Sequence, residues 1–328
     1  MAKSPAGGAR PTSWARDLRE RPGERHLSPV EIVGHGGLAV HNEGGSPSRD
    51  DLNVAMALGV DRLELDLCCT SDGRLVVRHD VCRPGGAPVS GVTLRTLRAA
   101  DPALLTLDEA VEHLDGRVPL LLDLKQARAA ELLGMWLRRR HDLEGFAVCT
   151  ENLPWLLRLR FAAPRLARWP SFPDLGDRRT HHVQSVMAGL WRSHASLGGL
   201  IRGAGDLHRA ARDLALRPQE ILAHIAGLPW RGRLPADLVE VHRDMAPAGL
   251  CVHQWVISEE LVGEAHLLGL HVNAWTVNNP FAARAVVAAG VDSVTTDRVE
   301  LVRIALHGRP RPRDGAPLLR AAARTGRS

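Results

Sequence analysis

The fold of this chain is most constrained by a repeated alternation between short apolar runs and longer segments with helical spacing. The apolar runs have the length of strands and are bounded by polar or turn-forming residues. They occupy residues 31–34, 62–67, 119–124, 146–150, 166–169, 271–277 and 293–296, and either 237–242 or 250–257 supplies a further strand. Because each helix returns the chain to the same edge of the sheet, strands that alternate with helices pair in parallel. The sequence therefore predicts an α/β protein with a parallel sheet.

Two of the intervening segments carry recognisable helix ends. Residues 50–59 have apolar side chains at helical spacing and finish on a glycine. Residues 106–116 begin with Thr106, have Glu109 three positions later and also finish on a glycine. A threonine followed by a glutamate at this spacing is typical of a capping box. Both segments therefore predict helices that connect strands.

The length of 328 residues allows one (β/α)₈ barrel with an insertion or two ordinary domains, since single barrels often have roughly 250 residues. The alternation breaks at residues 176–235, which we interpret as a helical insertion. Residues 1–29 and 308–328 are rich in Arg, Pro and Gly without periodicity, so we predict flexible tails there. The folded body is then expected at residues 30–307.

Composition is that of a globular protein, with 45% hydrophobic and 24% charged residues. The net charge of +5 is spread along the chain and into both tails, which favours no nucleic-acid partner. Five cysteines without the paired spacing of a zinc site favour free thiols in a reducing compartment. Without an apolar leader or an apolar run of membrane-spanning length, we predict a cytoplasmic protein with no membrane span. The oligomeric state is left open.

Two carboxylates close together in one apolar run are the most informative chemical feature. Glu64 and Asp66 alternate with leucines, so both acids lie on one face of the predicted strand. If that face is the interior of a barrel, desolvation and mutual repulsion disfavour two unpaired anions, and a bound divalent cation would compensate them. The alternative is a solvent-facing strand edge, or a pair of acids met by an arginine.

A second apolar run ends in an acid and a cation, Asp123 and Lys125, which share one face of their strand. In a barrel they would converge with the first two acids at the carboxyl end, where catalytic groups of that fold lie. Lys occurs only twice among the 42 Lys and Arg residues, so a lysine inside the folded body is unusual for this chain. Lys125 would serve as a compact cation for a phosphate oxygen. The alternative is an ordinary ion pair with Asp123.

Two of the 16 histidines, His35 and His79, follow apolar runs and so lie at strand ends. Cleavage of a phosphodiester needs one group that takes a proton from the nucleophile and one that protonates the leaving oxygen, and histidine titrates in the useful range. Their position, rather than their identity, marks these two as candidates.

Together the motifs resemble those of the glycerophosphodiester phosphodiesterase family, over roughly residues 31–175 and 250–303. In chain order they are His35 to Gly37, Gly59 to Asp66, Thr70 to Gly73, Val76 to Asp80, Leu105 to Glu109, Leu122 to Lys125, Asn273 to Asn278 and Gly290 to Asp297. The resemblance implies a TIM-type (β/α)₈ barrel that holds Ca²⁺ or Mg²⁺ on Glu64, Asp66 and Asp123. It also implies His35 and His79 as the acid–base pair, Lys125 on the phosphate and Trp275 as an apolar wall beside the substrate. Trp275 could equally be a core tryptophan.

Three departures from the family pattern leave alternatives open. Gly36 stands where the family usually has Arg, Ser46 lies where an acid is expected, and Asp123 is one methylene shorter than the usual Glu. The first interpretation is a hydrolase that converts glycerophosphodiesters to glycerol 3-phosphate and an alcohol. The others are a phospholipase D-like relative that forms a cyclic phosphate, and a catalytically impaired barrel that binds a phosphorylated ligand.

Overall fold

The computed structural model describes the chain from residue 29 to residue 308, with gaps. The described ranges are 29–39, 42–83, 86–140, 142–172, 245–254 and 257–308. The predicted insertion at 176–235 lies outside them, as do all but one residue of each predicted tail, 1–29 and 308–328.

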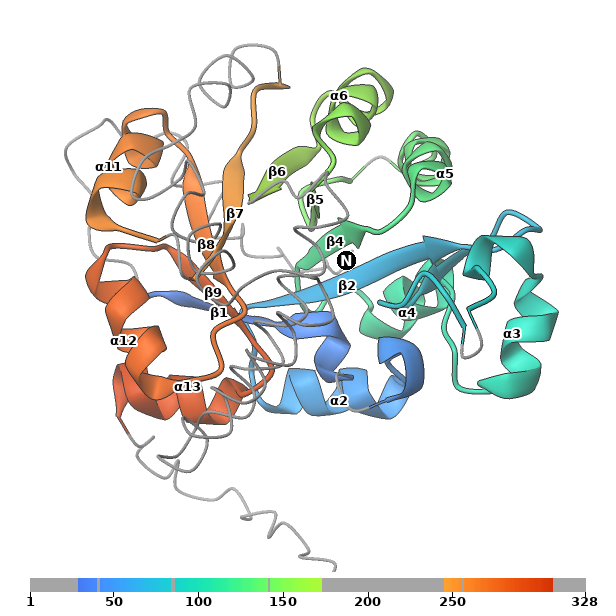
Figure 1. The fold of residues 1–328 in the computed structure, drawn as a ribbon, viewed down its shortest axis with the longest axis horizontal. Helices are drawn as coiled ribbons and strands as arrows, with labels where there is room; N and C mark the ends of the chain where they lie inside the picture. The colour runs from blue at the N-terminus through green and yellow to red at the C-terminus, as the bar shows by residue number, and fades with distance from the viewer. Residues whose placement is uncertain are drawn as a thin grey trace, which may run out of the picture.

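Eight parallel strands close into a barrel, which confirms the predicted fold class (Figure 1). In chain order they are β1 Glu31–Gly34, β2 Arg62–Cys69, β4 Leu120–Leu124, β5 Phe146–Thr150, β6 Ala167–Phe172, β7 Gly249–His253, β8 His271–Trp275 and β9 Ser293–Thr296. Pairing of β1 with both β2 and β9 closes the barrel. A short strand, β3 (Leu75–Val77), adds to β2 in the antiparallel direction. Of the two candidates for the sixth barrel strand, the later one is correct, because β7 lies there.

Helices surround the strands as an outer ring (Figure 1). They are α2 Arg49–Ala57, α3 Leu94–Ala100, α4 Leu107–Leu114, α5 Ala127–Leu137, α6 Leu153–Ala162, α11 Glu259–Leu267, α12 Pro280–Ala288 and α13 Val299–His307. The predicted capping box begins α4: Glu109 N–H donates to Thr106 Oγ1 at 3.3 Å, and Thr106 N–H donates to the Glu109 carboxylate at 2.8 Å. This reciprocal pair satisfies two amides that the helix itself leaves without partners.

Alternation along the strands separates an outer and an inner core. The leucines of β2, Leu63, Leu65 and Leu67, are fully buried in the large cluster between the strands and the helices. Burial of each such side chain contributes roughly 1.5–3 kcal/mol relative to leaving it exposed. A smaller cluster comprises Leu121, Ala147, Cys149, Ala167, Trp169 and Cys251. The intervening side chains of β2, Glu64 and Asp66, are also buried.

The amino end of the barrel is filled by aromatic and charged side chains. The Arg62 guanidinium lies 5.1 Å from the Trp169 ring centre, and the Trp169 ring stacks on His271 at 4.6 Å. Arg62 also pairs with Glu31 at 3.7 Å. Glu31, Arg62 and His271 are the first residues of their strands, so these side chains fill the amino end of the barrel. In this fold the active site lies at the opposite, carboxyl end.

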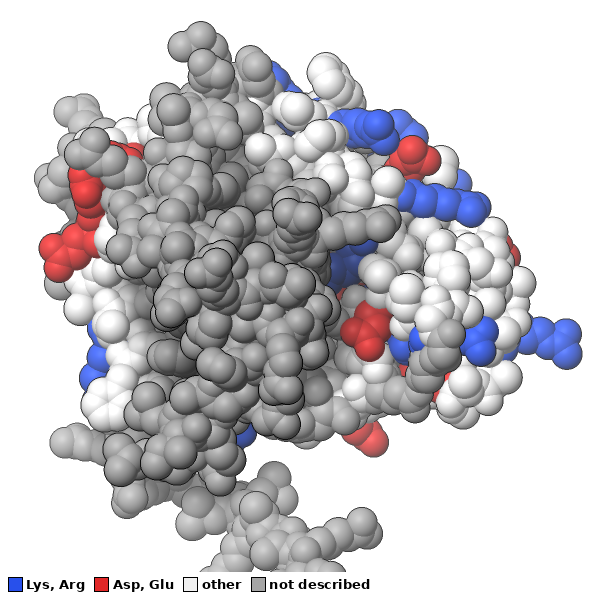
Figure 2. All heavy atoms as spheres, in the orientation of Figure 1, with Lys and Arg blue, Asp and Glu red and all other residues white. Residues whose placement is uncertain are grey.

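Figure 2 shows both basic and acidic side chains among the described residues that are visible on this face. None of the helices in the described ranges combines the length and apolar composition that a membrane crossing requires.

Candidate active site

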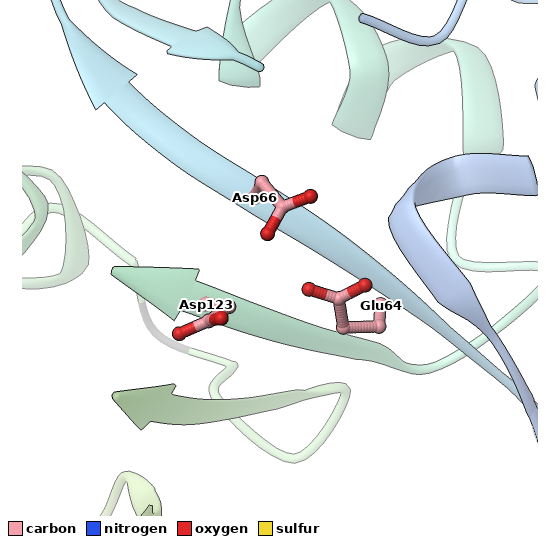
Figure 3. Close-up of side chains that lie close together, drawn as sticks. All are labelled: Glu64, Asp66 and Asp123. Carbon is pink, nitrogen blue, oxygen red and sulfur yellow. The ribbon is translucent and has the colours of Figure 1, made fainter. Parts of the chain in front are cut away.

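Three carboxylates converge inside the carboxyl end of the barrel (Figure 3). Adjacent strands β2 and β4 pair with Asp66 opposite Asp123, and Glu64 lies two residues before Asp66 on the same face of β2. One oxygen from each acid lies within 4.8 Å of the others. Glu64 is 5% and Asp66 2% exposed, so two of the three acids are nearly shielded from water.

Lys125 lies against this acidic cluster, defined as Glu64, Asp66 and Asp123. Its Nζ is 2.6 Å from Asp123 Oδ2 and 2.9 Å from Asp66 Oδ1. Burial opposes the charge of Lys125, but the charges of Asp123 and Asp66 raise its pKa well above the usual value. One ammonium therefore faces three carboxyl groups.

The pKa shifts of the acids indicate that Lys125 does not fully compensate their negative charge. Burial, reinforced by the negative charge of Asp66, raises the pKa of Glu64 well above its usual value. Burial likewise raises the pKa of Asp123 although Lys125 opposes the shift. For Asp66, burial is outweighed by Lys125 and by the two candidate histidines, which hold the pKa below the usual range. The cluster thus retains an affinity for further positive charge.

A divalent cation with a preference for oxygen fits this cluster. The donors are all carboxylate oxygens, the ligands that Ca²⁺ and Mg²⁺ favour, and the grouping contains no histidine or cysteine. Asp66 Oδ1 is buried and lies 2.9 Å from Lys125 Nζ, but within the described ranges no donor has the geometry of a hydrogen bond to it. Glu64, Asp66 and Asp123 are the residues that would hold such an ion.

His35 follows β1 and faces the same end of the barrel. Its Nδ1 is 2.6 Å from Asp297 Oδ1, at the end of β9. Burial lowers the pKa of His35, but the hydrogen bond and charge of Asp297, with the charges of Glu64 and Asp66, raise it to about 9. Asp297 in turn accepts a hydrogen bond from Asn278 Nδ2 at 2.5 Å.

His79 lies beyond β3 and is more exposed than His35. Its side chain is 54% exposed, and its Nδ1 is 3.0 Å from the equally exposed Asp80 carboxylate. The backbone of Gly45 lies against it, since a methyl group added to that glycine would meet His79 Cβ at 2.7 Å. The positive charge of His79 contributes to the lowered pKa of Asp66, which places His79 near the cluster.

Trp275 ends β8 and is partly buried against His253, which ends β7; the ring centres are 5.0 Å apart. The indole Nε1 is buried and has no hydrogen-bond partner among the described residues. Burial lowers the pKa of His253 to about 4, so its imidazole is neutral at pH 7. Sequence reasoning assigned no role to His253, because nothing local distinguishes it from the other histidines.

Two of the three departures from the family pattern, Gly36 and Ser46, have a structural context. Gly36 has a left-handed backbone (φ 53°), and its N–H donates to Glu64 Oε2 at 2.5 Å. Ser46 is buried, and its hydroxyl accepts from Arg78 Nη1 at 3.3 Å. Arg78 Nε donates to the backbone oxygen of Asp80 at 3.1 Å. The Arg78 guanidinium thus supports the loops that carry Ser46 and Asp80.

A closed (β/α)₈ barrel with acids, a lysine and two histidines at its carboxyl end has the architecture of a barrel enzyme. A family model, the Glycerophosphoryl diester phosphodiesterase family, matches residues 233–301. That range contains the motifs around Trp275 and Asp297. No curated protein matches the chain.

Solved structures of glycerophosphodiester phosphodiesterases share the fold. The one from Parabacteroides distasonis ATCC 8503 has a TM-score of 0.59 at 18% identity, over 85% of this chain and 98% of that chain. The one from Thermotoga maritima has a TM-score of 0.56 at 17% identity, over 84% and 98%. A phosphodiesterase from Oleispira antarctica in complex with the product sn-glycerol-3-phosphate has a TM-score of 0.58 at 17% identity, over 84% and 96%. The similarity establishes the barrel and, with the family model, confirms the resemblance that the motifs predict.

Proposed function

We propose that the chain is a metal-dependent phosphodiester hydrolase that converts glycerophosphodiesters to glycerol 3-phosphate and an alcohol. The observation that carries the proposal is the acidic cluster with Lys125 at the carboxyl end of the barrel. Three acids with one lysine suit a cation and a phosphate together, because the positive charges of the cation and the lysine offset the negative charges of the acids and the phosphate. The product bound to the relative from Oleispira antarctica is consistent with this substrate class.

The residues of the chain divide the chemical work. Lys125 donates to a phosphate oxygen and stabilises the charge that develops there. His35, protonated because of Asp297, suits the donor that protonates the leaving oxygen, and His79 takes the proton of the attacking group. A bound divalent cation supplies Lewis-acid stabilisation of the phosphoryl charge. Trp275 lines the site beside the organic part of the substrate.

The test is hydrolysis of a panel of glycerophosphodiesters with added Mg²⁺ or Ca²⁺, followed by ³¹P NMR of the products. We expect a phosphomonoester, and no turnover after dialysis against excess EDTA. Asp123→Asn should abolish activity, whereas Asp108→Asn, which removes an acid of α4 bonded to Trp136, should not. Unchanged hydrolysis in EDTA removes the metal dependence, and a cyclic phosphate identifies the phospholipase D-like alternative.

A second candidate is a barrel that binds a phosphorylated ligand without turnover. The absence of a side chain at Gly36 favours it, because the phosphate then lacks the guanidinium that the family places there. Saturable binding of glycerol 3-phosphate without hydrolysis of any diester in the panel would establish this candidate.

A further inference from the structure

A row of hydrogen bonds connects the ends of three strands behind His35. Asp297 presents Oδ1 to His35 Nδ1 at 2.6 Å and Oδ2 to Asn278 Nδ2 at 2.5 Å. His35 follows β1, Asn278 follows β8 and Asp297 follows β9. The sequence motifs contain Asn278 and Asp297, but no role was assigned to either.

Asn278 is itself held in one orientation. Its Oδ1 accepts from the Asp297 N–H at 2.8 Å and from Thr296 Oγ1 at 3.0 Å. The side chain amide therefore cannot exchange its nitrogen and oxygen without facing a donor with a donor. Its Nδ2 is thus directed at Asp297, whose carboxylate is 15% exposed.

The position of Asp297 determines which nitrogen of His35 reacts. A carboxylate only accepts hydrogen bonds, so Nδ1 of His35 carries a proton in both the neutral and the charged ring. Nε2 is then the atom that gains or loses the proton. The charges of Glu64 and Asp66 also favour a positive His35, but within the described ranges the ring nitrogens pair with Asp297 and not with either of these acids.

We propose that Asp297 and Asn278 are positioning residues that fix the ring orientation and the tautomer of His35, so that Nε2 serves the reaction. The expected effect on kcat rests on the proposed function, whereas the expected proton on His35 Nδ1 does not. In the part of the chain that the structure describes, the other candidate histidine, His79, pairs only with its chain neighbour Asp80, and both side chains are more than half exposed.

The chain offers a matched control for this proposal. Asp292 also contacts a histidine, His266, with 2.9 Å between Oδ2 and Nε2, at the opposite end of β9. Asp292→Asn therefore removes the same type of pair outside the candidate site. Asp297→Asn keeps the shape of the side chain but allows its amide to donate toward His35 Nδ1. This favours the tautomer that carries its proton on Nε2.

We expect Asp297→Asn to lower kcat by about 10²-fold or more while KM changes by less than about threefold, because orientation acts on the chemical step. Asn278→Ala should have a smaller effect of the same kind. Asp292→Asn should leave both constants unchanged. Equal losses for Asp297→Asn and Asp292→Asn, or a loss confined to KM, would overturn the positioning role.

A spectroscopic measurement separates this inference from the proposed function. With ¹⁵N-labelled histidine, the Nδ1 proton of His35 should give a downfield resonance protected from solvent exchange, assigned by its loss in His35→Gln. The resonance should disappear in Asp297→Asn and persist in Asp292→Asn, with circular dichroism unchanged. Its absence from the wild type, or its survival in Asp297→Asn, overturns the proposal. An inactive wild type that shows the expected resonances would contradict the proposed function alone.

Discussion

Replacement of Lys125 separates the charge of this residue from its shape. Lys125→Met removes the ammonium that lies 2.6 Å and 2.9 Å from two carboxylate oxygens, and Lys125→Arg keeps the charge on a planar group. If the cluster binds a cation, Lys125 competes electrostatically with that cation for the same carboxylates. Loss of the ammonium should then strengthen metal binding even as it weakens binding of the phosphodiester.

The size of the effect follows from the charges. Two unit charges about 4 Å apart interact by about 1 kcal/mol in water and about 4 kcal/mol at the effective dielectric constant of a protein surface. Lys125 is 24% exposed and lies between these limits. The two charges of a divalent cation double these energies, and about 1.4 kcal/mol is tenfold in affinity, so the limit for water alone predicts that Lys125→Met tightens cation binding by at least about 25-fold.

Calorimetric titration with Mg²⁺ or Ca²⁺ measures the affinity, and thermal unfolding with and without the ion provides a second readout. Lys125→Met should unfold at a lower temperature without metal and gain more from metal than the wild type. Arg98→Met is the control, because Arg98 pairs with Glu109 outside the cluster and its loss should not change metal-induced stabilisation.

Lys125→Arg should bind the ion about as tightly as the wild type, yet lose nearly as much kcat/KM as Lys125→Met. The ammonium of Lys125 is compact enough to lie between Asp66 and Asp123 and also to contact a phosphate oxygen. The wider, planar guanidinium of an arginine cannot do both. Cation binding by Lys125→Met that is no tighter than that of the wild type would refute the competition. Full activity of Lys125→Arg would make Lys125 a structural ion-pair partner.

Three further predictions concern single side chains. His35→Ala and His79→Ala should each lower kcat by about 10²-fold or more with an unchanged circular dichroism spectrum, and near wild-type rates in either would reassign that histidine to a structural role. Trp275→Ala should raise KM more than it lowers kcat, as steady-state kinetics on two head groups can show. Burial opposes the charge of Asp292, but the hydrogen bond of His266 lowers its pKa below the usual value. Its contribution to stability is therefore present above the unfolded pKa of about 4 and lost as pH falls through the lower folded value. Urea midpoints of Asp292→Asn should accordingly fall less than those of the wild type on acidification, and equal falls would contradict the linkage.

The acidic cluster could be predicted from sequence because its signal is local. Glu64 and Asp66 alternate with leucines, so one period-two pattern placed both on the buried face. Convergence with Asp123 followed from the predicted parallel strands and the barrel. The register that sets Asp66 opposite Asp123 comes from the packing of the whole sheet and has no local signal.

The features that could not be predicted from the sequence depend on contacts between residues far apart in the chain. Nothing near Asp297 indicates that its carboxylate faces His35, because the two meet only when the barrel closes. His253 is distinguished by its burial against Trp275, which is a tertiary property. The apolar run before His79 does form the expected strand, β3, but its antiparallel pairing with β2 depends on contacts distant in sequence.

The contact between His35 and Asp297 joins residues that are 262 positions apart. During synthesis the amino-terminal half of the barrel leaves the ribosome with its acids and both histidines, but without the strand that orients His35. A nascent chain therefore carries the three carboxylates of the acidic cluster long before it carries the carboxylate that contacts His35. If His35 serves in the proposed reaction, the site is complete only in chains that have been translated past Asp297.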